Sequence, residues 1–239
     1  ASCVLILLVS VIPIKNHNLE IMAFDVGNAD SFLIKTPENK YIMIDTAKSG
    51  YNGGKSQAEM LILKYMLDRG IKELDTLIVT HFDNDHCGGA VDLMNELRVK
   101  NLYVNSINHP SVAAKEIYET ADIRGVNLIL AENNKTIYES NGLALKNFIS
   151  PESLEIGDNE ASILTLLSYK DFSMLFTGDA GIETFNRLKK NLPKDITVLK
   201  VGHHGALGVV NKEVINYLNP KISLISVGEN KFGHPSIYT

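Results

Sequence analysis

The run HFDNDH at residues 81–86 constrains this chain most, because it directly follows a short apolar segment at residues 74–80. An apolar run of this length is typical of a strand buried in a sheet that is covered on both faces. Two glycines, Gly88 and Gly89, then open a predicted helix through Leu97. A strand, a turn rich in acids and histidines, and a helix together predict a functional site at the carboxyl end of a strand in a layered α/β protein.

Strands dominate the rest of the pattern, and helices are interspersed among them. Alternating or apolar runs predict two strands within residues 19–34, joined by a turn at 25–30, and further strands at 40–45, 101–104, 127–130, 143–149, 162–169, 172–177, 197–201 and 221–227. Helical spacing predicts helices at 57–69, 113–124, 182–190 and 212–217. This order of elements suits β-sheets that are layered between helices.

The 239 residues are enough for one sizeable core, so we expect a single globular domain. The net charge of −5 gives no global attraction to nucleic acid, although a local basic strip remains compatible with it. Two cysteines, Cys3 and Cys87, form neither a disulfide framework nor a CxxC pair. We expect Cys87 to pack as a small apolar residue, with a role as a soft metal ligand as the alternative.

Both ends of the chain stop within a pattern. Residues 4–14 read VLILLVSVIPI, which is shorter than the roughly 20 apolar residues of a membrane-spanning helix. They fit the remnant of a membrane or export segment, a signal h-region or a buried element. We expect residues 1–18 to be the remnant of a membrane or export segment and residues 19–239 to be the globular domain, truncated at its C-terminus.

Four side chains of the central run are candidate metal ligands. If the strand stays extended past Thr80, His81 and Asp83 point to the same side, because side chains alternate along a strand. Asp85 and His86 follow where the chain turns into the helix. Imidazoles suit zinc, and carboxylates also accept manganese or magnesium. This set exceeds the need of one tetrahedral ion, so it predicts two ions about 3.5–4 Å apart that share a hydroxide.

The same run is also compatible with a solvated acidic loop, since aspartates are common in turns. Three other motifs, TGD at 177–179, HHG at 203–205 and GHP at 233–235, favour the metal site, because each comes after a predicted strand. Five of the seven histidines lie in the central run or in these motifs, which contribute the side chains of Asp179, His203, His204 and His234.

Together the motifs HxDxDHxGG, TGD, HHG and GHP resemble the metallo-β-lactamase superfamily, whose usual core motif is HxHxDH. Asp83 replaces the middle histidine, and this form is similar to the hydrolase domain of ComEC-type bacterial competence proteins and their stand-alone relatives. The segment FDVGNADS at 24–31 is similar to their DVGQGDS opening, and NEAS at 159–162 followed by LFTGD resembles their NxxS…LLTGD segment. The similarity spans about residues 19–235.

The resemblance implies an α/β fold, an αββα sandwich of two mixed β-sheets flanked by helices, with the site along one edge. It implies that His81 and Asp83 bind the first of two divalent ions, Zn or Mn. Asp85 and His86 would bind the second ion, and Asp179 would bridge the two.

The remaining histidines are less clearly assigned. His234 stands where the superfamily's last ligand is expected, while His203 or His204 is a ligand or contacts the leaving group. The spacing of the two histidines in the sequence does not decide which of them takes which role. Many members have another histidine ligand before the bridging aspartate, and the candidate here, His109, precedes Pro110 in a loop and fits poorly.

Five further residues are predicted to support the site, each with a plainer alternative. Asp45 matches the superfamily's early aspartate, which hydrogen-bonds the metal loop, but it also fits a strand-end turn. Asp25 and Asp30 orient loop amides or merely cap turns. Asn159 and Ser162 reach substrate or bond only nearby backbone.

The resemblance implies a metal-dependent phosphodiesterase or nuclease that acts on DNA in competence or DNA uptake. A hydroxide that bridges the metals would attack the phosphorus, Asp85 would orient it and take its proton, and His204 (or His203) would assist the leaving oxygen. Lys200 is expected to be solvated, although an amine near a phosphate would be useful. Nucleic acid is then the partner, with membrane attachment through residues 1–18, and the sequence identifies no protein partner. The location would be the extracellular face of the bacterial membrane or secreted, with the cytoplasm as the alternative.

Two other hypotheses stay open. The same hydroxide would hydrolyse a small acyl substrate, such as a lactone, thioester or β-lactam, if the groove is closed and apolar. The third hypothesis is a non-catalytic DNA-binding module that has lost efficient metal binding. The shape of the groove discriminates the first two, and a metal assay separates the third.

Overall fold

The computed structural model of the chain describes residues 18–51, 54–150 and 155–239. The expected lead segment therefore lies, except for Asn18, outside the described residues. Within the described ranges, no helix combines the length and the apolar character that crossing a bilayer requires.

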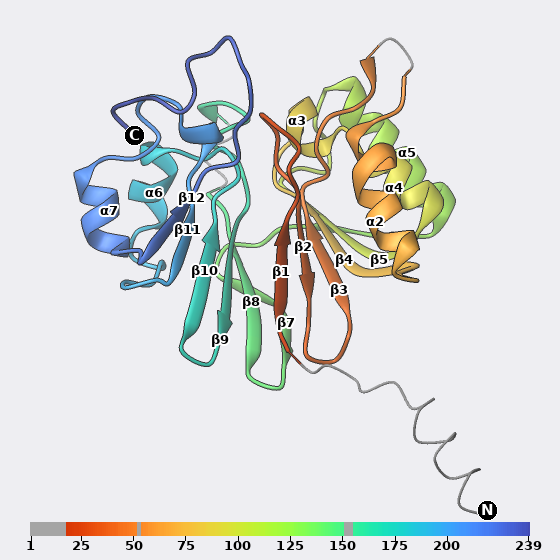
Figure 1. Cartoon of the computed structure of the whole chain (residues 1–239), viewed down its shortest axis with the longest axis horizontal. Helices are drawn as coiled ribbons and strands as arrows, with labels where there is room; N and C mark the ends of the chain where they lie inside the picture. The colour runs from red at the N-terminus through yellow and green to blue at the C-terminus, as the bar shows by residue number, and fades with distance from the viewer. Residues whose placement is uncertain (1–17, 52–53, 151–154) are drawn as a thin grey trace, which may run out of the picture.

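Two mixed β-sheets pack face to face, and helices cover their outer faces (Figure 1). The first sheet has the order β1-β2-β3-β4-β5-β6, with β1 (Glu20–Ala23), β2 (Phe32–Lys35), β3 (Tyr41–Ile44), β4 (Glu73–Val79), β5 (Arg98–Val104) and β6 (Asn127–Leu130). The second has the order β12-β11-β10-β9-β8-β7, with β7 (Lys135–Ser140), β8 (Leu143–Phe148), β9 (Leu164–Tyr169), β10 (Phe172–Phe176), β11 (Val198–Lys200) and β12 (Ile222–Leu224). This arrangement confirms the predicted αββα sandwich.

The helices divide between the two outer faces (Figure 1). The first sheet carries η2 (Ala58–Leu63), α2 (Lys64–Asp68), α4 (Ala90–Glu96) and α5 (Val112–Arg124), and the second carries α6 (Ile182–Leu188) and α7 (Lys212–Leu218). Local sequence fixes their ends: Ser111 Oγ accepts a hydrogen bond from Ala114 N at 3.2 Å, and Asn211 Oδ1 accepts one from Val214 N at 2.9 Å. Gly125, with φ +66°, ends α5 in the left-handed conformation that favours glycine.

Apolar side chains form three layers, as a sandwich between helices requires. Between the sheets, Phe32 meets Phe176 edge-to-face with ring centroids 5.1 Å apart. The same layer holds Ile34, Ile42, Ile44 and Ile78 of the first sheet and Leu143, Leu145, Leu167 and Met174 of the second. The outer layers pack each sheet against its own helices.

Parallel pairing brings the predicted motifs to one edge. β3 and β4 are parallel, with Ile44 opposite Ile78, and β10, β11 and β12 are parallel in the other sheet. The carboxyl ends of parallel strands lie at the same edge of a sheet. The segments that follow β3, β4, β10 and β11 therefore meet at the upper edge in Figure 1, beside the short α3 (Asn84–Cys87).

Two details differ from the predicted elements. The edge strand β7 was not predicted, because its sequence KTIYES is largely polar and half-exposed. The helix expected from the two glycines starts earlier, since α3 precedes them and α4 follows them. Glycine is required between these helices, because a Cβ on Gly89 would lie 2.3 Å from the Cβ of Ala58.

A carboxylate joins the two sheets at the end opposite to the motifs. Glu38, in the β2–β3 turn, accepts hydrogen bonds from Tyr138 Oη at 2.9 Å, from Ser140 Oγ at 3.0 Å and from Asn141 Nδ2. Burial raises the pKa of Glu38, but these hydrogen bonds outweigh it and lower the pKa to about 2.

We expect Glu38→Gln to lower the free energy of unfolding at pH 7 by about 1 kcal/mol, because the donors lose a charged acceptor in a partly screened position. A depressed pKa contributes stability above the unfolded value of 4.5, and this stability is lost as the pH falls towards about 2. Urea unfolding of both proteins between pH 7 and pH 2 should show curves that converge in acid. A constant difference across this range would contradict the assignment. Glu139→Gln is the control, because Glu139 is exposed and lies on β7 between the two hydroxyl donors, Tyr138 and Ser140.

Candidate metal centre

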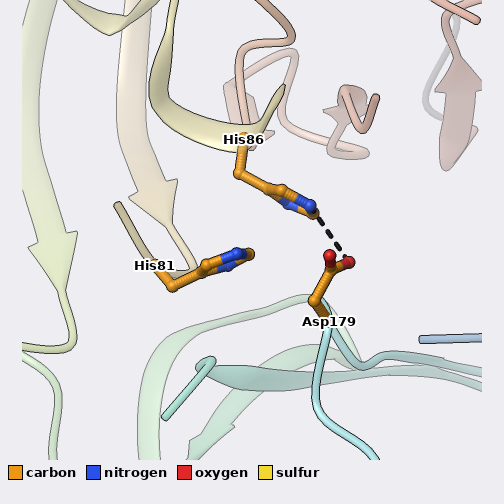
Figure 2. A group of neighbouring side chains, drawn as sticks. All are labelled: His81, His86 and Asp179. Carbon is orange, nitrogen blue, oxygen red and sulfur yellow. Dashed lines mark ion pairs between the residues drawn. The ribbon is translucent and has the colours of Figure 1, made fainter. Parts of the chain in front are cut away.

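Side chains from both sheets converge at the motif edge (Figure 2). Among the described residues, three groups of three residues each offer ligand atoms within 4.8 Å of one another. One of them, Asp30, Asp45 and His86, lies at His86 Nδ1, which is 2.7 Å from Asp45 Oδ2 and 3.7 Å from Asp30 Oδ2, so the other two are the candidate ion sites. The first is His81, His86 and Asp179, and the second is Asp85, His86 and His204. The central run therefore lies beside the aspartate of the TGD turn and one histidine of the HHG motif.

Hydrogen bonds fix the tautomers of two of these histidines. His204 Nδ1 lies 2.8 Å from the carbonyl oxygen of Ser226, which only accepts, so this nitrogen carries the hydrogen. His86 Nδ1 lies 2.7 Å from Asp45 Oδ2, a carboxylate that likewise accepts. Both rings thus turn Nε2 towards the centre, which is the nitrogen that would bind an ion once it carries no hydrogen.

The third ring, His81, is held by a chain of hydrogen bonds. Thr80 Oγ1 donates its hydrogen to Asp45 Oδ2 at 2.8 Å, so it accepts from His81 Nδ1 at 3.1 Å. Ser162 Oγ lies 3.2 Å from the same Nδ1 and accepts from Asp179 N at 3.0 Å. Thr80 and Ser162 therefore orient His81, and Ser162 also positions the backbone of Asp179.

The centre fits divalent metal ions. The Nε2 atoms of His81 and His204 are buried and have no hydrogen-bond partner among the described residues, and the buried His86 Nε2 faces the carboxylate of Asp179. Buried polar atoms without partners are costly, and nitrogen and carboxylate donors at this spacing suit zinc or manganese. One imidazole nitrogen binds one ion, so His86 serves only one of the two groups. Asp179 faces both, since Oδ1 lies 3.0 Å from His86 Nε2 and Oδ2 lies 3.9 Å from His204 Nε2.

The charges around His86 show why an ion is favoured there. Burial lowers the pKa of His86, but Asp179 and Asp45 raise it well above its usual range. Burial raises the pKa of Asp179, but His86 and Lys200 hold it well below its usual range. A proton on His86 thus balances the carboxylates, and a bound cation would replace it.

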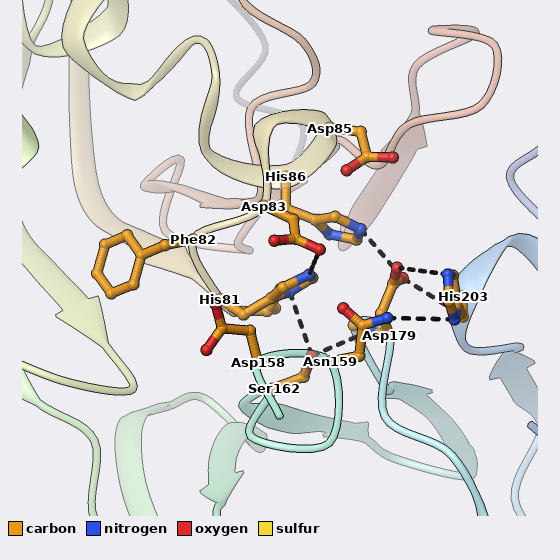
Figure 3. A network of polar contacts seen from close by, with 12 residues as sticks. His81, Phe82, Asp83, Asp85, His86, Asp158, Asn159, Ser162, Asp179 and His203 are labelled. Atoms are coloured by element: carbon orange, nitrogen blue, oxygen red, sulfur yellow. Dashed lines mark hydrogen bonds and ion pairs between the residues drawn. The ribbon is translucent and has the colours of Figure 1, made fainter. Parts of the chain in front are cut away.

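The two aspartates of the central run lie towards solvent (Figure 3). The Asp83 side chain is 50% exposed, and its Oδ2 lies 3.7 Å from His81 Nε2. The Asp85 side chain is 26% exposed, and its Oδ2 lies 3.4 Å from His204 Nε2. Asp83 lies outside the two compact groups but within reach of an ion on His81.

The structure separates the three C-terminal histidines. His204 is buried within the second group, whereas the His203 side chain is 37% exposed, with Nε2 4.0 Å from Asp179 Oδ2. The His234 ring lies 5.4 Å from the ring of His203 and 6.4 Å from that of His204, outside both groups. His203 and His204 have φ values of +45° and +52°, a left-handed backbone that directs the successive rings apart. Ligand roles for His203 and His234 stay predictions.

The predicted supporting residues occupy different places. Asp45 is buried and accepts from Thr80 N at 2.8 Å, so it braces the start of the metal loop. Asn159 Nδ2 lies 3.3 Å from His203 Nδ1. Asp30 is buried beneath the centre, while Asp25 is exposed.

His109 lies outside both ligand groups. Its Nε2 is 3.0 Å from Asp158 Oδ1, its Nδ1 is 2.9 Å from Ser111 Oγ, and its ring stacks on Phe82 at 4.8 Å.

Cys87 is buried, and its thiol donates to the carbonyl oxygen of Phe82 at 3.3 Å. Burial, together with Asp45, raises the pKa of the Cys87 thiol to about 12, and Cys87 belongs to none of the ligand groups.

Four contributors were not predicted from sequence. Lys200 is buried instead of solvated, and its Nζ donates to the carbonyl oxygen of Gly178 at 2.7 Å. The carbonyl of Ser226 leaves no sequence signal, whereas Thr80 could have been found because it directly precedes the motif. Gly178 is needed as glycine, since its φ is +52° and a Cβ would lie 2.8 Å from the Cβ of Ser162.

We expect Asp45→Asn to weaken metal binding about 10- to 100-fold. An amide NH₂ facing His86 Nδ1 favours the tautomer with hydrogen on Nε2, which blocks the ligand atom. Competition titration with a chromogenic chelator measures the affinity, and circular dichroism checks the fold. Asp158→Asn, which alters a carboxylate paired with His109, is the matched control. Equal affinity in Asp45→Asn and the unmodified protein would refute this role.

Comparisons with known proteins agree with this geometry. The model of the family described as the metallo-beta-lactamase superfamily matches residues 24–229. ComE operon protein 3 of Bacillus subtilis (strain 168) is 28% identical over 250 residues, covering 98% of this chain and 31% of the relative. Recombination protein 2 of Haemophilus influenzae is 31% identical over 222 residues, covering 91% of this chain and 26% of the relative. The chain thus spans less than a third of the length of these relatives.

Solved structures share the fold at low identity. The metallo-beta-lactamase fold protein YhfI from Bacillus subtilis has a TM-score of 0.55 at 10% identity and covers 88% of each chain. CmlA, a diiron beta-hydroxylase from Streptomyces venezuelae, has a TM-score of 0.57 at 14% identity and covers 91% of this chain and 48% of its own. From the family match and the architecture, this chain belongs to the metallo-β-lactamase superfamily.

Proposed function

We propose that this domain is a metal-dependent phosphodiesterase that cleaves DNA. The observation that carries the proposal is the pair of adjoining ligand groups with Asp179 facing both, because two neighbouring divalent ions are typical of phosphodiester hydrolysis. Relatives that match most of this chain carry the names Competence protein ComA, from Neisseria gonorrhoeae, and Recombination protein 2, which supports nucleic acid as the substrate.

Bound ions would supply an activated water and neutralise the charge that builds on the phosphate. On this proposal His81, Asp83 and Asp179 hold one ion, and His86, His204 and Asp179 hold the other. In this assignment each imidazole Nε2 would bind a single ion.

Asp85 is the proposed proton acceptor. Burial raises its pKa, but His204 and His86 lower it below the usual value, so the carboxylate is ionised at neutral pH. Its partly exposed position lets it reach water. His204 is buried and its Nδ1 is held by Ser226, which suits a ligand, whereas the more exposed His203 is placed to assist the leaving oxygen.

The openness of the centre supports a polymer over a small acyl substrate. Asp83, Asp85 and His203 all reach solvent, while the ligand atoms behind them are buried. A chain of nucleotides can lie across such an edge without entering a closed pocket. Hydrolysis of a lactone or thioester remains the alternative that the same experiment discriminates.

We expect the purified protein, loaded with Mn²⁺ or Zn²⁺, to cleave single- or double-stranded DNA. Asp85→Ala should lower the rate at least 100-fold, because it removes the proton acceptor. Labelled DNA resolved on a denaturing gel gives the rates, and Asp122→Ala, an exposed acid on α5, is the control.

Absence of cleavage by the unmodified protein, or equal cleavage by Asp85→Ala, would contradict the nuclease proposal. Turnover of a lactone or thioester by a metal-loaded protein that leaves DNA intact would support the acyl alternative. A protein that binds DNA but retains no metal after purification without chelator would be the non-catalytic module.

A further inference from the structure

Lys200 ends β11 directly beneath the metal centre, and its side chain is 1% exposed. Its Nζ donates to the carbonyl oxygen of Gly178 at 2.7 Å and contacts the carboxylate of Asp30 directly. The same nitrogen lies 3.7 Å from Asp179 Oδ1. The ammonium therefore has three oxygen partners in the interior, one of which belongs to a proposed ligand.

These partners come from opposite halves of the sandwich. Asp30 precedes β2 of the first sheet, whereas Gly178 and Asp179 follow β10 of the second. Asp30 also holds the metal loop through its backbone, since its N–H donates to the carbonyl oxygen of Asp85 at 3.0 Å. Lys200 thus joins both sides of the centre through one charged group.

The charge balance shows what this group does. Asp30, Asp45 and Asp179 are buried near one another, and His86 by itself would leave these three carboxylates with excess negative charge in the interior, which is strongly unfavourable. Among the described residues, Lys200 is the only buried lysine or arginine. The partners of its Nζ named above are all oxygens, two of them in carboxylates, and such contacts stabilise the ammonium form.

We propose that Lys200 is a positioning residue, a permanent internal cation that holds Asp30 and Asp179 in place when the divalent ions are absent. The centre is then already assembled when ions arrive. Because the ammonium and the ions act on the same carboxylate of Asp179, their stabilising effects overlap. This inference concerns the metal centre and holds whether or not the substrate is DNA.

The test is the thermal stability of Lys200→Met, which keeps the length of the side chain without its charge. In metal-free protein the variant leaves buried carboxylates unpaired, and we expect its Tm to fall by about 10 °C. Saturating Mn²⁺ or Zn²⁺ should remove at least half of this deficit, because the ions neutralise Asp179. The proposal is overturned by a deficit that is the same with and without ions, or by no deficit at all.

Lys100→Met is the matched control. Lys100 makes ion pairs with Glu73 at 2.6 Å and with Asp75 at 3.3 Å on the surface of the first sheet, away from the centre. Exposed pairs contribute little, so its Tm should change by no more than about 2 °C in either state.

A second variant decides the matter if Lys200→Met does not fold. Asp30→Asn combined with Lys200→Met removes the buried pair as a unit, which is tolerated better than removal of one partner. Asp179 still lacks its fixed cation in this protein. A rise in Tm on metal addition larger than that of the unmodified protein supports the proposal. An equal or smaller rise means that Lys200 serves only to pair with Asp30, and it overturns the inference.

Discussion

The carboxylate of Asp45 is the interaction on which the rest of the centre depends. It is buried at the end of β3 and accepts from Thr80 N, Thr80 Oγ1 and His86 Nδ1. Through these hydrogen bonds one side chain fixes the end of β4, the tautomer of His86 and, by way of Thr80, the tautomer of His81. The positions of the remaining ligands matter only because these two rings are already oriented.

Such a centre gathers charge where a fold ordinarily buries apolar side chains. The carboxylates and imidazoles at the edge are stabilised by one another and by Lys200 rather than by packing. Burial of these charged groups is unfavourable, and the packing of the three apolar layers behind them offsets its free-energy cost. Function and stability are therefore divided between two parts of one sandwich, which is the arrangement expected of strands whose interiors are apolar and whose carboxyl ends are polar.

The sequence predicted those strands, helices and site positions that depend on a local pattern of residues. The apolar run before His81, the strand before Asp179 and the helical spacing of α5 all follow from residues close in the chain. The different positions of His203 and His204 could not be predicted from nearby residues. They depend on a left-handed turn and on the carbonyl oxygen of Ser226, which is more than twenty residues away. The burial of Lys200 also escaped prediction, since its partner Asp30 comes from the other sheet.

Two charged contacts bind the sheets to each other at opposite ends: Glu38 with the β7–β8 hairpin, and Lys200 with Asp30. Two sheets that are joined at both ends resist separation by a hinge motion at either end. Any widening of the edge that carries the centre must then come from the connecting segments that border it. Changes in those segments should accordingly alter the shape of the edge, while the two sheets keep the same spacing.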